Sequence, residues 1–451
     1  MFTRNKVRKL TSGTAALAGV ALLLSGCASS GPTTTETSEA ATETEITEPV
    51  TITVLTDNAE NNIAFTEALV AAFAEVEPDI TVEIETRPGG SDGDNIVKTK
   101  LATGEMNDVF FYNSGSLLQA LNPDQNLVDL SNEPWAERVN ASFWPTVSTA
   151  NGKYGAPNGS AMGGGIIYNR NVYADLGLEV PLTWDEFMAN NAKIKAAGIA
   201  PVCQTYGDTW TSQLFVLADF HNVLQSEPNF AEEYTANVAK YATSPAAMRG
   251  FEYLEELHDA GYFNDDYASA LFPDGVMKVA SGECAHYPQL TFVVSTLLGM
   301  APDLVSNVGF FAQPGEDAAK NGLTVWMPGG SYIPKTTEGA ELVAAKKFVD
   351  FVLSKEGLQL YIDVNGFTGP FLISDAPVVS DLLPAYADML PYFEKESATS
   401  PALEFLSPIK GPSLEQITVA TGTGQYSAAE AAALYDEDVK KQAQQLGLDG
   451  W

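Results

Sequence analysis

The most constraining feature of the sequence is a strand–helix–strand alternation that begins at residue 50. Residues 50–55, VTITVL, alternate with a period of two and are rich in β-branched side chains, which predicts a strand. Residues 63–76 have helical spacing, and residues 80–84 alternate again. A strand, a helix and a strand in this order favour a parallel sheet with a right-handed crossover. We expect a further helix over 95–103 and a third strand over 108–112.

A second body of the same kind is predicted from about Gly163 onward. A single core stops growing at about 250–300 residues, so a chain of 451 residues should contain more than one. Two capping boxes, Thr183 with Glu186 and Ser427 with Glu430, mark helix starts, and Ser244-Pro245 marks another. We expect strands over 166–168, leading into residue 203 and within 276–287, and helices over 334–354 and 427–446.

The amino terminus has the pattern of an export signal. Four basic residues within the first nine precede an apolar run, Ala15–Leu24, that is too short to span a membrane. The run ends in Leu24-Ser-Gly-Cys27, which resembles the lipobox of bacterial lipoproteins. That resemblance implies that residues 1–26 are a lipoprotein signal peptide and that Cys27 receives the lipid. An ordinary signal peptide with a chance cysteine is the alternative.

Residues 27–49 follow as a Thr- and Glu-rich segment with almost no apolar side chains. Such a composition cannot bury a core, so we expect a lipid-anchored disordered tether. The expected location is the outer face of the cytoplasmic membrane. Membrane contact is expected only through the lipid on Cys27, because no later segment is long and apolar enough to span.

The charge balance excludes some partners. Asp and Glu number 58 against 24 Lys and Arg, which gives a formal net charge of −34. Nucleic acid and anionic lipid surfaces would repel such a chain, so we expect no nucleic-acid partner.

The sequence has two cysteines after Cys27, Cys203 and Cys284, in runs predicted to be strands of the same lobe. In an exported chain they can form a disulfide or stay as two separate buried thiols.

Several motifs occur in the order of a known family. The sequence is similar to the extracellular solute-binding proteins, family 1, of bacterial ABC sugar importers, the group of the maltose-binding protein. The resemblance covers residues 50–370, with His286 at a position where the family usually has Met. The segments that carry it are Tyr154-Gly-Ala-Pro157, Gly165–Asn169, Leu176-Gly177, Thr183–Phe187, Ala280–Tyr287, Ile333–Lys335, Ala344–Phe348 and Glu356-Gly357.

The resemblance implies an α/β fold of the periplasmic-binding-protein type, a two-lobe clamp in which each lobe is a mostly parallel sheet flanked by helices. Two or three hinge crossings would join the lobes, near 156–161, 323–327 and 372–377. Lobe 1 is expected to comprise residues 50–158 plus 328–374, and lobe 2 residues 159–327 plus 375–451. The implied protein is a monomer that captures a carbohydrate between its lobes and delivers it to an ABC permease, with no catalysis.

Polar and aromatic residues after the predicted strands and at the predicted crossings are the expected ligand contacts. Ligands of open α/β sheets bind outside the carboxyl ends of the strands. Sugar hydroxyls need planar polar groups, and the C–H face of a sugar needs an aromatic wall. The predicted ligand-binding residues are Asp57, Asn58, Glu60, Asn61, Asn113, Ser114, Asn158, Tyr206, Asp208, Trp210, Tyr287, Gln289, Trp326 and Ser331.

Other functions stay open as alternatives. The same clamp could bind an amino acid, a peptide or another small solute, but a carboxylate ligand would need a basic residue. The predicted rim loops contain none, which favours a neutral sugar. A secreted glycosidase would need two carboxylates about 5–10 Å apart, and acidic residues are too common here for any pair to stand out. No metal site is expected, because the three histidines have no ligand spacing, and no cofactor is expected.

Overall fold

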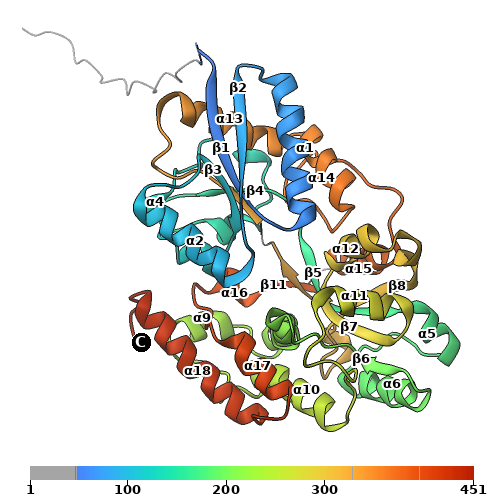
Figure 1. Ribbon diagram of the computed structural model, residues 1–451. Helices are drawn as coiled ribbons and strands as arrows, with labels where there is room; N and C mark the ends of the chain where they lie inside the picture. Colours follow the sequence, from blue (N-terminus) through green and yellow to red (C-terminus); the bar gives the residue numbers. More distant parts are fainter. Residues whose placement is uncertain (1–45, 47, 328, 396) are drawn as a thin grey trace, which may run out of the picture. The chain divides into compact units, whose positions relative to one another are not determined.

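The computed structural model describes residues 46, 48–327, 329–395 and 397–451, which belong to one compact unit. The signal peptide, Cys27 and nearly all of the predicted tether lie outside the described residues. The remainder is an α/β protein with two sheets, each flanked by helices (Figure 1). This confirms the predicted fold class.

The first sheet has the strand order β2-β1-β3-β10-β4. Strands β1, β2 and β3 are parallel, whereas β10 pairs antiparallel with both β3 and β4. The bounds are β1 Val50–Asp57, β2 Ile80–Arg87, β3 Val109–Asn113, β4 Gly155–Pro157 and β10 Gly329–Tyr332.

The second sheet has the order β11-β9-β5-β7-β6, with β8 also paired to β5. Cys203, directly after β6, forms a disulfide with Cys284 at the start of β7. The pairs β11–β9 and β6–β7 are parallel, and those of β5 with β7, β8 and β9 are antiparallel. The bounds are β5 Met162–Asn169, β6 Ala200–Val202, β7 Cys284–Leu290, β8 Val308–Ala312, β9 Leu323–Trp326 and β11 Thr399–Pro401.

Both sheets are therefore mixed, which corrects the expectation of mostly parallel sheets. The cause is the set of chain segments that pass between the sheets. Strand β4 continues into β5, and β9 continues into β10, so each of these strands enters one sheet directly from the other. A strand that arrives in this way has no crossover helix and runs against its neighbour.

Helices α1, α13 and α14 pack together beside the first sheet (Figure 1). On α1 the side chains of Phe65, Leu69 and Phe73 are buried at helical spacing. Helix α13 begins at Gly339 rather than at the predicted Pro334. The helices of this lobe are α1 Glu60–Val76, α2 Gly90–Thr103, α3 Ser116–Gln119, α4 Pro123–Asn126, α13 Gly339–Val352 and α14 Lys355–Asn365, with the 3-10 helices η1 Ala136–Arg138 and η2 Trp144–Val147.

The other helices belong to the second lobe, where α10, α17 and α18 pack together (Figure 1). The three predicted helix starts are confirmed: both capping boxes form, and Ser244 caps α10 with Pro245 at its first position. The helices are α5 Arg170–Leu176, α6 Trp184–Ala196, α7 Leu214–Ala218, α8 Phe220–Ser226, α9 Phe230–Thr235, α10 Pro245–Asp259, α11 Phe272–Ser281, α12 Val293–Met300, α15 Pro384–Glu394, α16 Leu403–Leu406, α17 Leu414–Gly422 and α18 Ala428–Gln445, with η3 Thr209–Gln213, η4 Pro302–Asn307 and η5 Ala318–Lys320.

The second sheet is buried on both faces. Successive side chains of a strand point to opposite faces, and along β5 Ile166 and Ile167 join different hydrophobic clusters. Phe310 and Phe311 of β8 divide in the same way. One of these clusters continues into the core of the first lobe, so the lobes share buried apolar side chains near the crossing strands.

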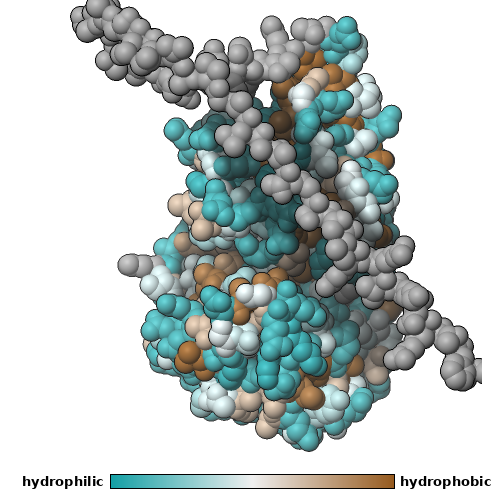
Figure 2. Space-filling view, turned by 90° about the vertical axis from the view of Figure 1, so that its left-hand side faces the viewer, coloured by the Kyte–Doolittle hydropathy of each residue, from teal (hydrophilic) through white to brown (hydrophobic). Residues whose placement is uncertain are grey.

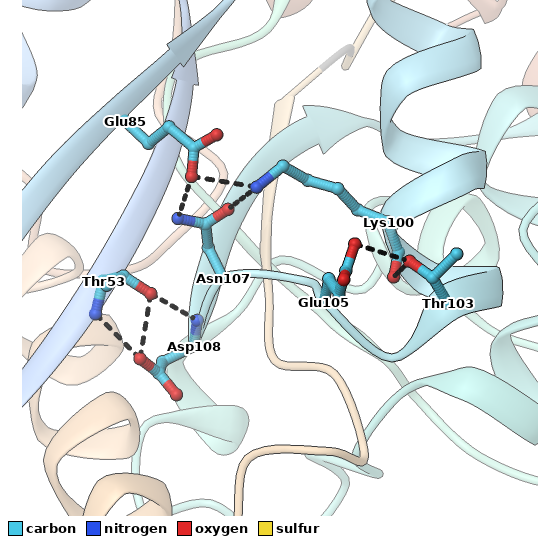
Figure 3. A network of polar contacts seen from close by, with 7 residues as sticks. All are labelled: Thr53, Glu85, Lys100, Thr103, Glu105, Asn107 and Asp108. Atoms are coloured by element: carbon cyan, nitrogen blue, oxygen red, sulfur yellow. Dashed lines mark hydrogen bonds and ion pairs between the residues drawn. The ribbon is translucent and has the colours of Figure 1, made fainter.

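A polar network fixes α2 against the first sheet (Figure 3). Lys100, in the last turn of α2, donates to Glu85 at 2.9 Å and to Asn107 at 3.1 Å. The Lys100 contact lowers the pKa of Glu85. Asp108 accepts from the backbone and the hydroxyl of Thr53 at 2.8 and 2.9 Å. These contacts fix the positions of β1, β2, β3 and the carboxyl end of α2 relative to one another.

The face drawn in Figure 2 is mostly hydrophilic and carries a few separate hydrophobic patches. Within the part of the chain that the structure describes, no helix has both the length and the apolar character needed to cross a membrane.

Candidate functional site

Two adjoining hollows lie at the carboxyl ends of strands β1, β2 and β3. The first hollow has a volume of about 180 Å³ and is lined by Thr56, Asp57, Asn62, Phe65, Thr66, Arg87, Phe111, Tyr112, Asn113, Asn158, Gly159, Ser160, Met162, Gly329 and Tyr361. The second hollow has a volume of about 530 Å³ and is lined by Asp57, Arg87, Gly89, Gly90, Asp94, Asn95, Lys98, Asn113, Ser116, Leu117, Ala120, Gln213, Pro408, Lys410, Gly411, Pro412, Leu414, Glu415 and Gln442.

Three residues line both hollows, and each is the last residue of a strand. Asp57 ends β1, Arg87 ends β2 and Asn113 ends β3. Asp57 and Arg87 are register partners in the β1–β2 ladder. Because the three strands are parallel, their carboxyl ends meet at one edge of the sheet and form a common wall of the two hollows. We call the two hollows together the cleft.

Asp57 is held in place by its own loop. Its Oδ1 accepts from the backbone N–H of Ala59 at 2.9 Å, and its Oδ2 accepts from the amide of Asn62 at 2.8 Å. Asn62 lines the first hollow beside it. The loop after β1 therefore presents an oriented carboxylate and amide, the kind of group that bonds hydroxyls.

The crossing segment supplies another wall of the first hollow. Asn158, Gly159 and Ser160 lie between β4 and β5 and line it. A side chain at Gly329 would begin 2.0 Å from Oδ1 of Asn158, so the glycine makes room for this amide. Tyr361 lies opposite and bonds the Thr368 hydroxyl at 3.0 Å, and burial raises its pKa.

The second hollow also takes a wall from the second lobe. Gln213 lies on η3, Lys410 on the loop before α17, and Glu415 on α17. Thr209 donates to Glu415 at 2.8 Å and Ser212 to the backbone of Glu415 at 3.1 Å, which ties η3 to α17. This hollow is therefore bounded by groups from both lobes.

Three half-buried aromatic rings gather in the second lobe, on the segments η3 and α11 and just after β7. Trp210 packs with its ring centroid 5.2 Å from that of Phe272 and 6.2 Å from that of Phe292, and Phe272 and Phe292 are 5.8 Å apart. Trp210 lies on η3 with Gln213, and Phe292 follows the carboxyl end of β7. We call these three rings the aromatic cluster. Such a surface is suited to the C–H face of a sugar ring.

The structure brings three of the predicted contacts together: Asp57, Asn113 and Asn158 line the cleft. Trp210 belongs to the aromatic cluster, and Asp208 supports it by accepting from the backbone N–H of Phe272 at 2.7 Å. Asn58 and Glu60 are exposed at the start of α1, and Asn61 is exposed and donates to Asn365 of α14. None of these three residues lines either hollow.

The other predicted contacts are buried and line neither hollow. Ser114 donates to the carbonyl of Met327 at 2.6 Å, and Tyr287 bonds the Thr205 hydroxyl at 2.7 Å. Trp326 donates to Glu404 at 2.6 Å, and its ring fills the space left by the absent side chain of Gly164. The polar side-chain atoms of Tyr206, Gln289 and Ser331 are buried without a hydrogen-bond partner among the described residues.

The sequence reasoning missed several residues that line the cleft or belong to the aromatic cluster. The chief reason is strand length. Strand β2 runs to Arg87, three residues beyond the predicted end, and β7 runs to Leu290, so Phe292 rather than Tyr287 follows its end. Applying the strand-end rule to β2 would have found Arg87, because Pro88-Gly-Gly90 marks the turn. The missed residues include Thr56, Asn62, Arg87, Lys98, Phe272, Phe292, Tyr361 and Lys410.

Arg87 also corrects one argument about the ligand. The predicted rim loops lacked a basic residue, and that absence favoured a neutral guest. The cleft does contain basic side chains, namely Arg87, Lys98 and Lys410. The inference that the site lacks a basic residue is therefore wrong. It considered only the predicted rim loops, and the predicted end of β2 lay three residues before Arg87.

The described ranges contain no group of three or more His, Cys, Asp or Glu side chains placed to hold a metal ion. Two of the histidines are structural. His286 is fully buried between Tyr173 at 2.7 Å and the carbonyl of Pro201 at 2.9 Å, and burial lowers its pKa to about 3. His221 bonds Ser400 at 2.9 Å beside β9.

Two α/β lobes joined by crossing strands, with a polar cleft bounded by both, define a solute-binding clamp. The chain belongs to the bacterial extracellular solute-binding protein family, whose model matches residues 58–359. It is 24% identical over 302 residues to the multiple sugar-binding protein of Streptococcus mutans, covering 66% of this chain and 70% of that one.

Solved structures with the same fold share little sequence. A chitin oligosaccharide binding protein is 22% identical with a TM-score of 0.77, and the alignment covers 87% of this chain and 99% of that one. A solute-binding protein in complex with raffinose is 20% identical with a TM-score of 0.71, covering 88% and 99%. These likenesses establish the fold.

Proposed function

We propose that this protein captures a carbohydrate between its two lobes and delivers it to an ABC permease. The observation that carries the proposal is the cleft, where oriented polar groups of the first lobe and Gln213 of η3 line one hollow, and η3 also carries Trp210 of the aromatic cluster. This combination matches the two needs of a sugar, hydroxyl partners and a flat apolar wall. The names of the relatives, a multiple sugar-binding protein and a chitin oligosaccharide binding protein, support it.

The lobe limits remain part of this proposal: residues 50–158 with 328–374 form lobe 1, and residues 159–327 with 375–451 form lobe 2. The two sheets support them, because β4 and β10 belong to one sheet and β5 and β9 to the other. Rotation about the crossing segments would close the lobes on the ligand, a known switching mode of such proteins. The closed form is the one that the permease subunits would recognise.

The anchor belongs to the proposal as well. The resemblance of Leu24–Cys27 to a lipobox supports a protein tethered by lipid on Cys27 to the outer face of the cytoplasmic membrane, and we propose that it acts as a monomer. Cells that express the full chain should incorporate labelled palmitate into it, and Cys27→Ala should abolish the label. Equal labelling of both chains would contradict the anchor.

A thermal-shift screen with sugars, amino acids and short peptides tests the function. A sugar present at 100 times its Kd should raise the free energy of unfolding by about 2.7 kcal/mol. Trp210→Ala should weaken binding of that sugar by about tenfold or more, because the ligand loses part of its aromatic wall. Isothermal titration calorimetry measures this loss.

Tyr426→Ala is the matched control, since it removes an exposed ring of the same lobe outside the cleft. Its affinity should equal that of the wild type. A shift by an amino acid but by no carbohydrate would show that the solute class is wrong. Release of reducing sugar from an oligosaccharide would instead indicate a glycosidase.

A further inference from the structure

Arg87 is a buried cation in the wall that the two hollows share. Its side chain is 6% exposed and lines both hollows. Nη1 donates to the carbonyl of Pro88 at 3.0 Å, and Nε has no hydrogen-bond partner in the part of the chain that the structure describes. No carboxylate of the described residues lies within ion-pair distance of it. A buried charge without a partner is unfavourable, so this guanidinium favours an anionic group in the cleft.

Asp57 and Asp94 line the second hollow with Arg87, and neither forms an ion pair with it. Both oxygens of Asp57 accept hydrogen bonds from its own loop. Asp94 faces Tyr112, whose pKa is raised by burial and by the charge of Asp94. The guanidinium lies 5.3 Å from the centre of the Tyr112 ring. The aromatic contact orients Arg87 without neutralising it.

The amino end of α2 lies against the same guanidinium. A side chain at Gly93, in the first turn of α2, would begin 2.5 Å from Nη1 of Arg87 and 1.9 Å from the carbonyl of Pro88. Only glycine allows this close approach. Gly89, the N-cap residue of this 14-residue helix, makes no side-chain cap and lines the second hollow with Gly90. A helix amino end carries partial positive charge and unpaired N–H groups, which bind anions.

The second hollow has as many basic as acidic lining residues, and its Lys410 also pairs with Glu404 at 3.8 Å. Lys98, on α2, and Lys410, from the second lobe, line the second hollow with Arg87, and the acidic residues that line it are Asp57, Asp94 and Glu415. In a chain with 58 acidic and 24 basic residues, this hollow is locally balanced. A ligand carboxylate would meet a buried cation here rather than the repulsion that the net charge implies.

We propose that the ligand of the cleft is an acidic carbohydrate, and that the carboxylate of a uronic acid unit binds between the Arg87 guanidinium and the amino end of α2. This inference rests on the proposed function and names the substrate class of the same site. A planar carboxylate matches the donor fork of arginine and can accept two parallel hydrogen bonds from it.

Calorimetry with a matched pair of ligands tests the inference. Trigalacturonate and its methyl ester have the same sugar rings and differ in charge, as do glucuronic-acid-substituted xylotriose and its methyl ester. In at least one pair the acid should bind the wild-type protein about tenfold more tightly or better, the effect of a charge-assisted hydrogen bond. Arg87→Gln should remove that preference, because it weakens binding of the acid more than binding of its neutral partner.

Arg138→Gln is the control, because it removes the same charge from a first-lobe residue outside both hollows. It should keep the full preference. If Arg87→Gln does not fold, Arg87→Lys replaces it, since lysine keeps the positive charge but lacks the planar pair of donors of the guanidinium. The preference for the acid over its neutral partner should then fall.

The possible results separate the two proposals. If neutral sugars bind and acids gain nothing, or if Arg87→Gln keeps the preference, the inference fails and the proposed function stands. If a sulfated sugar binds more tightly than every carboxylate, the anion is not a uronic acid and the inference is wrong. If no carbohydrate of either kind binds, the proposed function itself fails.

Discussion

Replacing both Cys203 and Cys284 with alanine should lower the free energy of unfolding by about 4 kcal/mol. The disulfide joins residues separated by 81 positions, so it removes much of the conformational freedom of the unfolded chain. Both cysteines are fully buried, and alanine leaves no unpaired polar group in their place. Denaturant unfolding followed by circular dichroism measures the change.

The bond also lies close to the candidate site. Cys203 directly precedes the loop and the helix η3 that carry Trp210 and Gln213. Reductant breaks the Cys203–Cys284 bond, so it should destabilise the wild-type protein to the level of the double variant. It should leave the stability of the variant unchanged, because the variant has no such bond. Equal midpoints for the oxidised wild type and the variant would show that the bond contributes little.

Gly115→Ala should lower the free energy of unfolding by about 2–4 kcal/mol. Gly115 has φ 67° and ψ −139°, a region that L side chains rarely adopt. A Cβ there would also lie 2.5 Å from the carbonyl oxygen of Glu404 and 2.7 Å from the ring of Phe405. The contact joins the loop after β3 to α16, so the variant should also push these segments apart.

Because Asn113 and Lys410 lie near this contact, we expect weaker ligand binding in the Gly115→Ala protein as well. Gly299→Ala in α12 is the control, since a Cβ there meets no atom within 4 Å. It should be neutral or stabilising, because alanine favours the helix. An unfolding midpoint for Gly115→Ala equal to that of the wild type would contradict the packing argument.

The order of strands and helices could be predicted because its signals are local. Period-two alternation gave β1 and β2, and the pairs Thr183 with Glu186 and Ser427 with Glu430 gave two helix starts, since a cap involves residues only three positions apart. Strand ends were less certain. The ladder between β1 and β2 continues to Asp57 and Arg87 because pairing with a neighbour, rather than alternation alone, decides where a strand stops.

The residues of the candidate site could be predicted only where a strand end or a crossing was placed correctly, as for Asn158 at the first crossing. Asp57 and Asn113 were found by the strand-end rule, whereas Tyr287 and Gln289 are buried because β7 continues past them. Arg87, Lys98 and Lys410 come from β2, α2 and a loop of the second lobe, and no local pattern links them.

The sequence by itself determined the fold class, the helix caps and the family, because periodicity, capping and short motifs are written in neighbouring residues. The tertiary structure decided which way the crossing strands run, that Cys203 meets Cys284, and that a buried arginine lies against the amino end of a helix. Those facts depend on packing between segments far apart in the chain, where strand pairing and side-chain volume select the contacts.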